Sequence, residues 1–244
     1  MRLVLASLSG QSDADWARAG AAYADAAVLG GIALDERSRA AAAAMVARDR
    51  DEFLPADPLT FVDRQLSALG DAPLRPGFNV RSTTTTHVRA ASEICADHDA
   101  VVEVNAHCRQ DELCAVGCGE TLLRDLDRLG SYVAAAAETG ATVSVKVRAE
   151  VPGVDLVETA RRIEAAGATA IHVDAMDTES VVADVAAATD LYLVANNGVR
   201  DRATVREYAD YGADAVSVGR PSDDPRVLAR VRDAVDDLSR EASP

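Results

Sequence analysis

Four side chains with reactive chemistry follow a short apolar run in the middle of the chain. Residues 101–104, VVEV, have the length and β-branched composition of a buried strand, and they lead into Asn105, His107, Cys108 and Arg109. These offer an amide, a titratable base, a soft nucleophile or acid, and a fixed cation. Parallel α/β folds place their reactive groups at the carboxyl ends of strands. The pattern therefore favours a catalytic strand end over a polar loop that only caps a strand.

Lys146 is a second candidate because the rest of the chain has no lysine. Of the 25 basic residues, 24 are arginine and Lys146 is the single lysine. It lies near the end of the β-branched run at residues 142–147. A lysine retained in such a chain indicates a need for a compact ammonium group whose pKa can be tuned.

Polar residues also follow the other apolar runs. The candidates at run ends are Asn79, Asn105, Cys108, Lys146, His172, Asn197 and Arg220. The last two runs end in Asn197-Gly198 and Gly219-Arg220, where glycine lets backbone N–H groups approach an anion. These two turns predict a phosphate site. His172 is either a hydrogen-bonding partner for a ligand ring or a satisfied structural residue.

The elements that must position these side chains alternate regularly. The predicted strands are residues 2–8, 26–32, 77–81, 101–104, 142–147, 170–173, 191–195 and 215–218. Helical spacing occupies residues 13–24, 35–50, 60–69, 88–97, a segment after Gly119 to about 139, 155–166, 178–188, 202–211 and 225–240. This alternation predicts one domain over residues 1–244, a (β/α)8 TIM barrel. An open doubly wound sheet is the alternative, but no Gly-rich dinucleotide fingerprint follows the first run.

Composition restricts the partners and the compartment. A net charge of −15 argues against a broad basic surface that binds nucleic acid. An acidic, arginine-rich surface is also typical of halophilic proteins from a high-salt cytoplasm. The four cysteines and the absence of a recognisable signal or membrane segment predict a cytoplasmic protein. The spacing of Cys108, Cys114 and Cys118 lacks the close pair of most zinc sites, so we expect no metal.

The quoted strand ends resemble those of the flavin-dependent tRNA-dihydrouridine synthases. The family's Asn-x-Gly-Cys-Pro tip and Gly-x-Gly-x-x-Leu helix start correspond to residues 105–109 and 117–122. VSVKVR, AIHVDAM, VANNGVR and GADAVSVGRP match further family motifs, and the LASLSG start is a looser match. FNVRS places Asn79 where the family usually has glutamine. The resemblance covers the whole predicted barrel.

This resemblance implies an FMN over the barrel mouth, with Asn197, Gly198, Gly219 and Arg220 around its phosphate. Lys146 would face the pyrimidine end of the flavin ring, and Asn79 and His172 would bond the ring edge. NADPH or NADH would reduce the flavin, which would then reduce a uracil ring at C6. Cys108 would protonate C5, so Cys108, Lys146 and His172 are the expected catalytic residues. Asn105 and Arg109 are the expected substrate contacts.

Three features depart from the family pattern. His107 and Arg109 replace the Gly and Pro around Cys108, Asp174 stands where the family has arginine, and the chain ends after the eighth helix without a C-terminal helical domain. These features indicate a compact archaeal-type branch whose substrate is either tRNA uridine or a smaller pyrimidine. A separate RNA-binding partner and the oligomeric state stay open.

Two other functions are compatible with the same strand ends. The first is a dihydroorotate or dihydropyrimidine dehydrogenase-like flavoenzyme that acts on a small pyrimidine. The second is a flavin-free sugar-phosphate isomerase or lyase, in which Lys146 forms a Schiff base or acts as acid and base. The second would need a carboxylate at the strand ends, for which Glu103 and Asp174 are the candidates.

Overall fold

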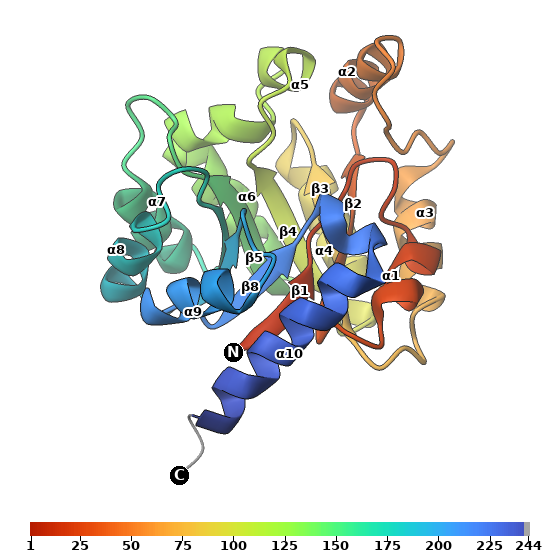
Figure 1. The fold of residues 1–244 in the computed structure, drawn as a ribbon. Coiled ribbons are helices and arrows are strands. Elements are labelled where there is room, and N and C mark those ends of the chain that lie inside the picture. The colour runs from red at the N-terminus through yellow and green to blue at the C-terminus, as the bar shows by residue number, and fades with distance from the viewer. Residues whose placement is uncertain (242–244) are drawn as a thin grey trace.

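The computed structural model describes residues 1–241 and shows a barrel. In these residues eight parallel strands pair in sequence order, and β8 pairs with β1 to close the sheet (Figure 1). The strands are β1 Arg2–Leu5, β2 Ala26–Ala33, β3 Arg75–Arg81, β4 Val101–Ala106, β5 Thr142–Arg148, β6 Ala170–Asp174, β7 Tyr192–Asn196 and β8 Ala215–Val218. The predicted (β/α)8 barrel is confirmed.

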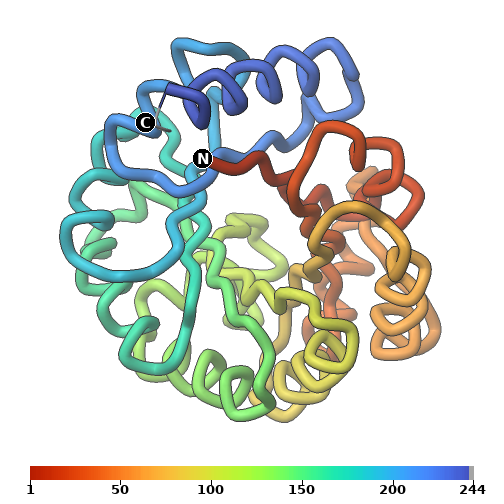
Figure 2. The backbone as a smooth tube through the Cα atoms, turned by 90° about the horizontal axis from the view of Figure 1, so that it is seen from below, coloured from red at the N-terminus to blue at the C-terminus, as the bar shows by residue number. Residues whose placement is uncertain are grey.

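Helices form a ring outside the strands, which Figure 2 shows in a view along the barrel. Their bounds are α1 Ala14–Gly20, α2 Glu36–Val46, α3 Pro58–Ser67, α4 Thr85–Asp97, α5 Asp111–Ala115, α6 Leu126–Ala137, α7 Leu156–Ala165, α8 Val181–Ala188, α9 Arg202–Asp210 and α10 Pro225–Glu241. The 3-10 helices η1 Gly119–Arg124 and η2 Arg220–Asp223 follow β4 and β8.

Acidic N-caps fix where many of these helices begin. The side chains of Asp13, Asp35, Asp57, Asp155 and Asp201 each accept hydrogen bonds from backbone N–H groups in the first turn of the helix that follows. Such caps satisfy donors that the helix itself leaves free. Part of the chain's negative charge therefore serves helix starts rather than a binding surface.

Alternation along each strand separates an apolar outer face from a polar interior. In β4, Val102 and Val104 belong to the core between strands and helices, whereas Glu103 and Asn105 belong to the barrel interior. The register places Asn105 beside Lys146 and Lys146 beside His172 on successive strands. The strand ends thus collect polar side chains at one height of the barrel.

Some predicted boundaries are wrong, and caps explain two of them. The helix predicted to run from Gly119 to about residue 139 is instead η1 followed by α6, because Asp125 interrupts it and caps α6 through the Arg128 N–H. The polar loop predicted before α4 is shorter, since Thr84 caps that helix. Asn105, which we predicted in a loop, is inside β4.

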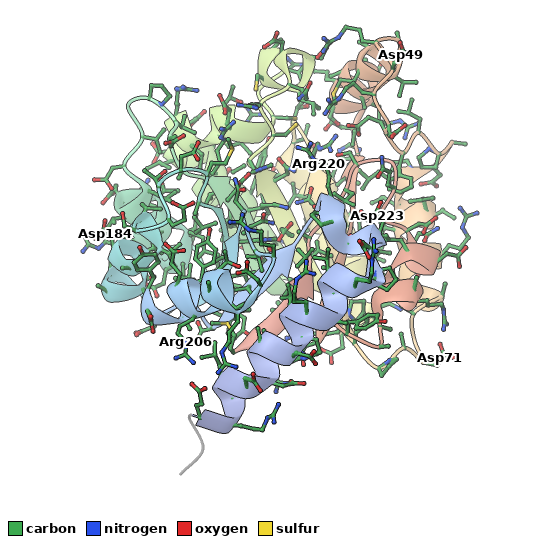
Figure 3. The ribbon with its side chains drawn as sticks, viewed as in Figure 1. Asp49, Asp71, Asp184, Arg206, Arg220 and Asp223 are labelled. Atoms are coloured by element: carbon green, nitrogen blue, oxygen red, sulfur yellow. The ribbon has the colours of Figure 1, made fainter. Side chains whose placement is uncertain are left out.

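Helices α2 and α5 stand above the barrel at the end that carries the strand tips (Figure 1). Ala41 and Met45 of α2 pack with Leu113 of α5, and Arg48 forms an ion pair with Glu112 at 2.6 Å. The two helices support one another and form one wall of the mouth. Figure 3 shows Asp49, just after α2, at this upper end.

Candidate active site at the barrel mouth

A cavity of about 490 Å³ opens at the carboxyl ends of the strands. Its polar and charged lining comes from several strand ends and from the segment after α2. The lining residues are Ser7, Leu8, Ser9, Gln11, Asp49, Arg50, Asp51, Asn79, Arg81, Asn105, His107, Cys108, Arg109, Gln110, Lys146, Arg148, Asp174, Met176 and Arg220. This volume lies in the range of about 300–1,000 Å³ that is typical of small-molecule sites.

The structure brings most of the sequence-predicted residues to this cavity. Those that line it are Asn79, Asn105, Cys108, Arg109, Lys146 and Arg220. The others, His172, Asn197, Gly198 and Gly219, lie below or beside it. Figure 3 places Arg220 at the mouth end of the barrel, opposite Asp71 and Arg206. The contacts that we expected these residues to make with ligands stay predictions.

Lys146 is buried but has no direct partner. Only 4% of the residue is exposed, and its ammonium group makes no hydrogen bond or ion pair within residues 1–241. Burial lowers the pKa of Lys146 below its usual value, although the nearby Glu103 and Asp174 oppose this shift. A buried ammonium group without a partner is costly. It is thus suited to an anionic or hydrogen-bond-accepting group of a molecule in the cavity.

Hydrogen bonds to its backbone groups hold Cys108 in place. Asn105 Oδ1 accepts the N–H groups of His107 and Cys108 at 3.2 and 3.0 Å. The Cys108 carbonyl oxygen accepts the Glu120 N–H at 2.9 Å. These bonds fix the loop after β4 and leave the Cys108 side chain partly exposed on the cavity wall.

Below the mouth, a chain of hydrogen bonds crosses the barrel interior. We call Asn79, Glu103, Asn105, His172 and Ser217 the polar layer. Asn105 donates to Asn79 at 2.8 Å, Asn79 donates to Glu103 at 2.7 Å, and His172 Nδ1 contacts the other Glu103 oxygen at 2.8 Å. His172 Nε2 contacts the Ser217 hydroxyl at 2.8 Å. All five residues are buried, so these bonds satisfy groups that water does not reach.

Charge states in the polar layer follow from its contacts. Burial alone would raise the pKa of Glu103, but His172, Lys146 and Asn79 outweigh it and hold that pKa at about 2. Burial lowers the pKa of His172, although Glu103 opposes the shift. Near neutral pH the carboxylate is therefore charged and the imidazole is neutral. His172 then donates from Nδ1 to Glu103 and accepts the Ser217 O–H at Nε2.

In this structure His172 has the contacts of the second alternative, a satisfied structural residue. Its exposed fraction is 1%, and both ring nitrogens contact protein groups. It lines a second cavity, at the amino-terminal end of the barrel, rather than the mouth. Contact with a molecule in the mouth would require one of these bonds to be exchanged.

The turns after β7 and β8 offer free backbone donors. The N–H groups of Asn197, Gly198 and Gly219 make no hydrogen bond within the described part of the chain. Asn197 and Gly198 both have positive φ, 95° and 66°, and a Cβ on Gly198 would meet no atom within 4 Å. Open space with unpaired donors suits an anion.

Sequence reasoning named Glu103 only as a carboxylate for the flavin-free alternative, and it missed the charged pair behind the mouth. Arg81 and Glu52 form a buried ion pair at 2.7 Å, and the Nε atoms of Arg81 and Arg148 are buried without a partner in the described residues. The available signal was the alternation that puts Glu103 and Asn105, or Asn79 and Arg81, on the same strand face. A charged residue inside an apolar strand requires such a partner.

Among residues 1–241, no group of three or more His, Cys, Asp or Glu side chains is placed to hold a metal ion. Burial raises the pKa of Cys114 to about 11 and that of Cys118 to about 12. Over the same residues, no helix has the length and apolar character needed to cross a membrane.

Comparison with known proteins adds a family and a fold. A family model described as dihydrouridine synthase matches residues 79–244, which is more than half of the chain. An uncharacterized protein of Methanocaldococcus jannaschii is 23% identical over 231 residues, covering 90% of this chain and 88% of that protein.

Solved structures share the barrel at low identity. DHODH from Eimeria tenella, solved in complex with ferulenol, has a TM-score of 0.71 and 14% identity, covering 99% of this chain and 82% of that chain. FabK from Thermotoga maritima has a TM-score of 0.60 and 16% identity over 95% of this chain. The chain spans 60% of the length of that FabK. These similarities concern the fold alone.

Proposed function

We infer the activity of this chain from its family: the chain belongs to the dihydrouridine synthase family, and it is an enzyme of the flavin-dependent oxidoreductase type. We propose that it binds FMN over the barrel mouth and reduces a uracil ring, with NADPH or NADH as the reductant. The observation that carries this proposal is Lys146, a buried ammonium group without a protein partner in residues 1–241, in the same cavity as a partly exposed thiol.

The residues at the mouth fit FMN. The unpaired N–H groups of Asn197, Gly198 and Gly219 and the side chain of Arg220 provide donors for a phosphate. Lys146 provides a cation for the electron-rich end of the flavin ring. When bound, FMN would supply a two-electron carrier, which no side chain in the cavity provides.

The chain's own groups then have separate tasks. Cys108 donates its thiol proton to the ring carbon that the reaction leaves electron-rich. Asn105 holds the Cys108 loop through two backbone N–H groups and holds Asn79 through its amide. Arg109, exposed beside Cys108, contacts the substrate. The charged Glu103 carboxylate favours the charged form of Lys146, and we propose that neutral His172 holds that carboxylate in place through its Nδ1–H.

The family makes a tRNA uridine the first candidate substrate. The charge balance favours a second candidate, a small pyrimidine, because a net charge of −15 repels a polyanion from most of the surface. Binding of tRNA would then require a separate RNA-binding partner. The same charge supports the proposal that the protein is halophilic, and we keep the proposal, made from the cysteines and the N-terminus, that it is cytoplasmic.

Flavin binding is tested first, by identifying what denatured protein releases and by titrating FMN and riboflavin into the apoprotein. We expect FMN to bind, and we expect Arg220→Ala to weaken FMN binding about tenfold while leaving riboflavin binding unchanged. Arg206→Ala is the matched control, because Arg206 lies on α9 at the other end of the barrel and pairs with Glu241 of α10. If Arg220→Ala weakened the binding of FMN and riboflavin equally, the proposed phosphate site would be contradicted.

Substrate class is tested by offering unmodified tRNA, uridine monophosphate and uracil with NADPH or NADH. A product two hydrogens heavier, with loss of the uracil absorption band, identifies the substrate. Oxidation of the nicotinamide without any reduced pyrimidine would contradict uracil-ring reduction.

A further inference from the structure

Two departures from the family pattern contact one another in the structure. His107 follows β4 directly, and Asp174 is the last residue of β6. The two strands are not neighbours, because β5 lies between them. His107 Nε2 nevertheless lies 2.6 Å from Asp174 Oδ2, so the pair spans the end of β5. We call His107 and Asp174 the dyad.

Asp174 is oriented on both oxygens. Its Oδ2 contacts His107, and its Oδ1 accepts the Asn197 amide N–H at 3.1 Å. Asn105 fixes the backbone of His107 from the other side. The exposed side-chain fractions are 31% for His107 and 14% for Asp174, and both residues line the mouth. The dyad is therefore held firmly yet open to the cavity.

The charges of the dyad determine which imidazole nitrogen is reactive. Burial would raise the pKa of Asp174, but the hydrogen bonds from His107 and Asn197 outweigh it, so the carboxyl is ionised. An ionised carboxylate only accepts, which places the imidazole proton on Nε2. Nδ1 then carries the lone pair, and it makes no hydrogen bond within residues 1–241.

Several charged groups act on this imidazole. Those that share its cavity or its electrostatic environment are Cys108 and Arg109 on its own loop, Lys146 and Arg148 on β5, His172 and Asp174 on β6, and Arg220 after β8. Burial lowers the pKa of His107, Lys146 and His172 act in the same direction, and Asp174 opposes them. The neutral imidazole is thus the resting form near pH 7.

We propose that the dyad is a proton shuttle that restores the Cys108 thiol after each turnover, an inference that rests on the proposed function. Once the thiol has given its proton to the ring carbon, the S–H bond is broken and a thiolate remains. Neutral His107 first takes a proton at Nδ1 from a hydronium ion, which leaves water. Because no hydrogen bond joins Nδ1 to Cys108 in residues 1–241, the proton then passes through water in the mouth that both residues line: the Nδ1–H bond breaks, the S–H bond re-forms and His107 is neutral again. Asp174 is the positioning residue that fixes the tautomer and stabilises the imidazolium.

The first test needs neither flavin nor substrate. The rate of Cys108 alkylation by iodoacetamide is measured against pH in the apoprotein, with peptide mapping to separate Cys108 from the other cysteines. The lone pair on Nδ1 of neutral His107 can accept the thiol proton as the sulfur attacks the reagent, so it speeds alkylation near neutral pH. We expect His107→Gln and Asp174→Asn to slow alkylation about tenfold at pH 7, because each variant removes or misorients the base.

The direction of this effect distinguishes a proton shuttle from a purely structural contact, in which the dyad only holds the loop that carries Cys108. Loss of a purely structural contact would expose Cys108 and make alkylation faster. A faster or unchanged rate in both variants would therefore overturn the proposal. Asp174→Asn preserves the size of the side chain, which guards against loss of the fold. His98→Gln is the matched control, because His98 Nε2 also contacts an aspartate, Asp63, at 2.8 Å but lies far from the cavity.

The second test uses the loaded enzyme. With the flavin already reduced, His107→Gln should convert one equivalent of substrate at the wild-type rate, because Cys108 starts protonated. Its steady-state rate should fall about 100-fold, and added imidazole should restore part of it. Equal single-turnover and steady-state losses would overturn the shuttle. Absence of any uracil reduction by the wild type would instead contradict the proposed function. The role of the dyad would then be tested by the alkylation rates alone.

Discussion

At the scale of single residues, Lys146 is the main reason to expect a bound molecule in the mouth. Its ammonium group is buried at the end of a strand, and nothing in residues 1–241 bonds to it. Glu103 and Asp174 provide negative charge nearby, so the ammonium is neutralised at a distance rather than paired. A group held in this way can stabilise charge that forms on a bound ring without first breaking a contact.

Substitution of Lys146 by arginine tests whether a compact ammonium is needed. Lys146→Arg keeps the charge, but its planar guanidinium is larger and cannot occupy the same point. We expect the variant to retain FMN, while stopped-flow measurement shows flavin reduction or substrate turnover slowed about 100-fold. Arg148→Lys, made in parallel, measures the same exchange in the other direction on the same strand. Wild-type rates in Lys146→Arg would mean that the single lysine has no special role.

At the scale of elements, the loop after β4 depends on a close approach between two backbones. A Cβ on Gly119 would lie 2.0 Å from the Cys108 carbonyl oxygen, and Gly119 has a φ of 64°. The adjacent Glu120 N–H bonds to that same oxygen. The start of η1 therefore supports Cys108, and the glycine permits the contact.

Gly119→Ala should displace Cys108, whereas Gly140→Ala should not. Gly140 also has a positive φ, 82°, but a Cβ there would meet no atom within 4 Å. Both variants should lose about 1 kcal/mol of unfolding free energy, measured in urea, from the backbone conformation. Only Gly119→Ala should also lose turnover, by about 100-fold, because a shift of about 1 Å is enough to misalign reacting groups. Similar turnover in the two variants would show that the approach of Gly119 to Cys108 does not matter for activity.

The sequence predicted the elements better than the contacts between their ends. Alternating apolar runs identified every strand of the barrel and collected Asn79, Cys108 and Lys146 at one mouth. Local spacing does not show the stagger of strands around a closed barrel, which sets the height of each inward residue. For that reason the sequence left open whether His172 contacts a ligand or is a satisfied structural residue. The contact between His107 and Asp174, across an intervening strand, was missed for the same reason.

At the scale of the whole molecule, the mouth carries charge opposite to that of the chain. The chain has 40 acidic and 25 basic residues, and many of the acids cap helices or pair with arginine on the surface. Six cations line the mouth, against three aspartates: the cations are Arg50, Arg81, Arg109, Lys146, Arg148 and Arg220, and the acids are Asp49, Asp51 and Asp174. A negative molecule with a cationic cavity draws small anions to that cavity while repelling large polyanions elsewhere.

The polar layer links this cavity to the stability of the barrel through pH. The pKa of Glu103 is lowered to about 2 in the folded protein, whereas it is about 4.3 in an unfolded chain. The unfolded state therefore binds more protons between these values. The charged carboxylate stabilises the fold above about pH 4.3, and this stabilisation is lost as the pH falls through about 2.

Glu103→Gln should remove this pH dependence. At pH 7 the variant leaves one of two hydrogen bonds to the layer unmade, and we expect its unfolding free energy to be lower by about 3 kcal/mol. The difference from the wild type, measured by urea unfolding, should shrink steadily as the pH is lowered from about 5 towards about 2, because the wild type loses its charged carboxylate over that range. Glu93→Gln is the matched control, since that carboxylate is exposed and pairs only with Arg89 at 3.3 Å within the described residues. If the unfolding free energies of the wild type and Glu103→Gln changed in parallel with pH, Glu103 would not gain a proton over this range. The contacts of His172 and Lys146 would then not depend on a charged Glu103.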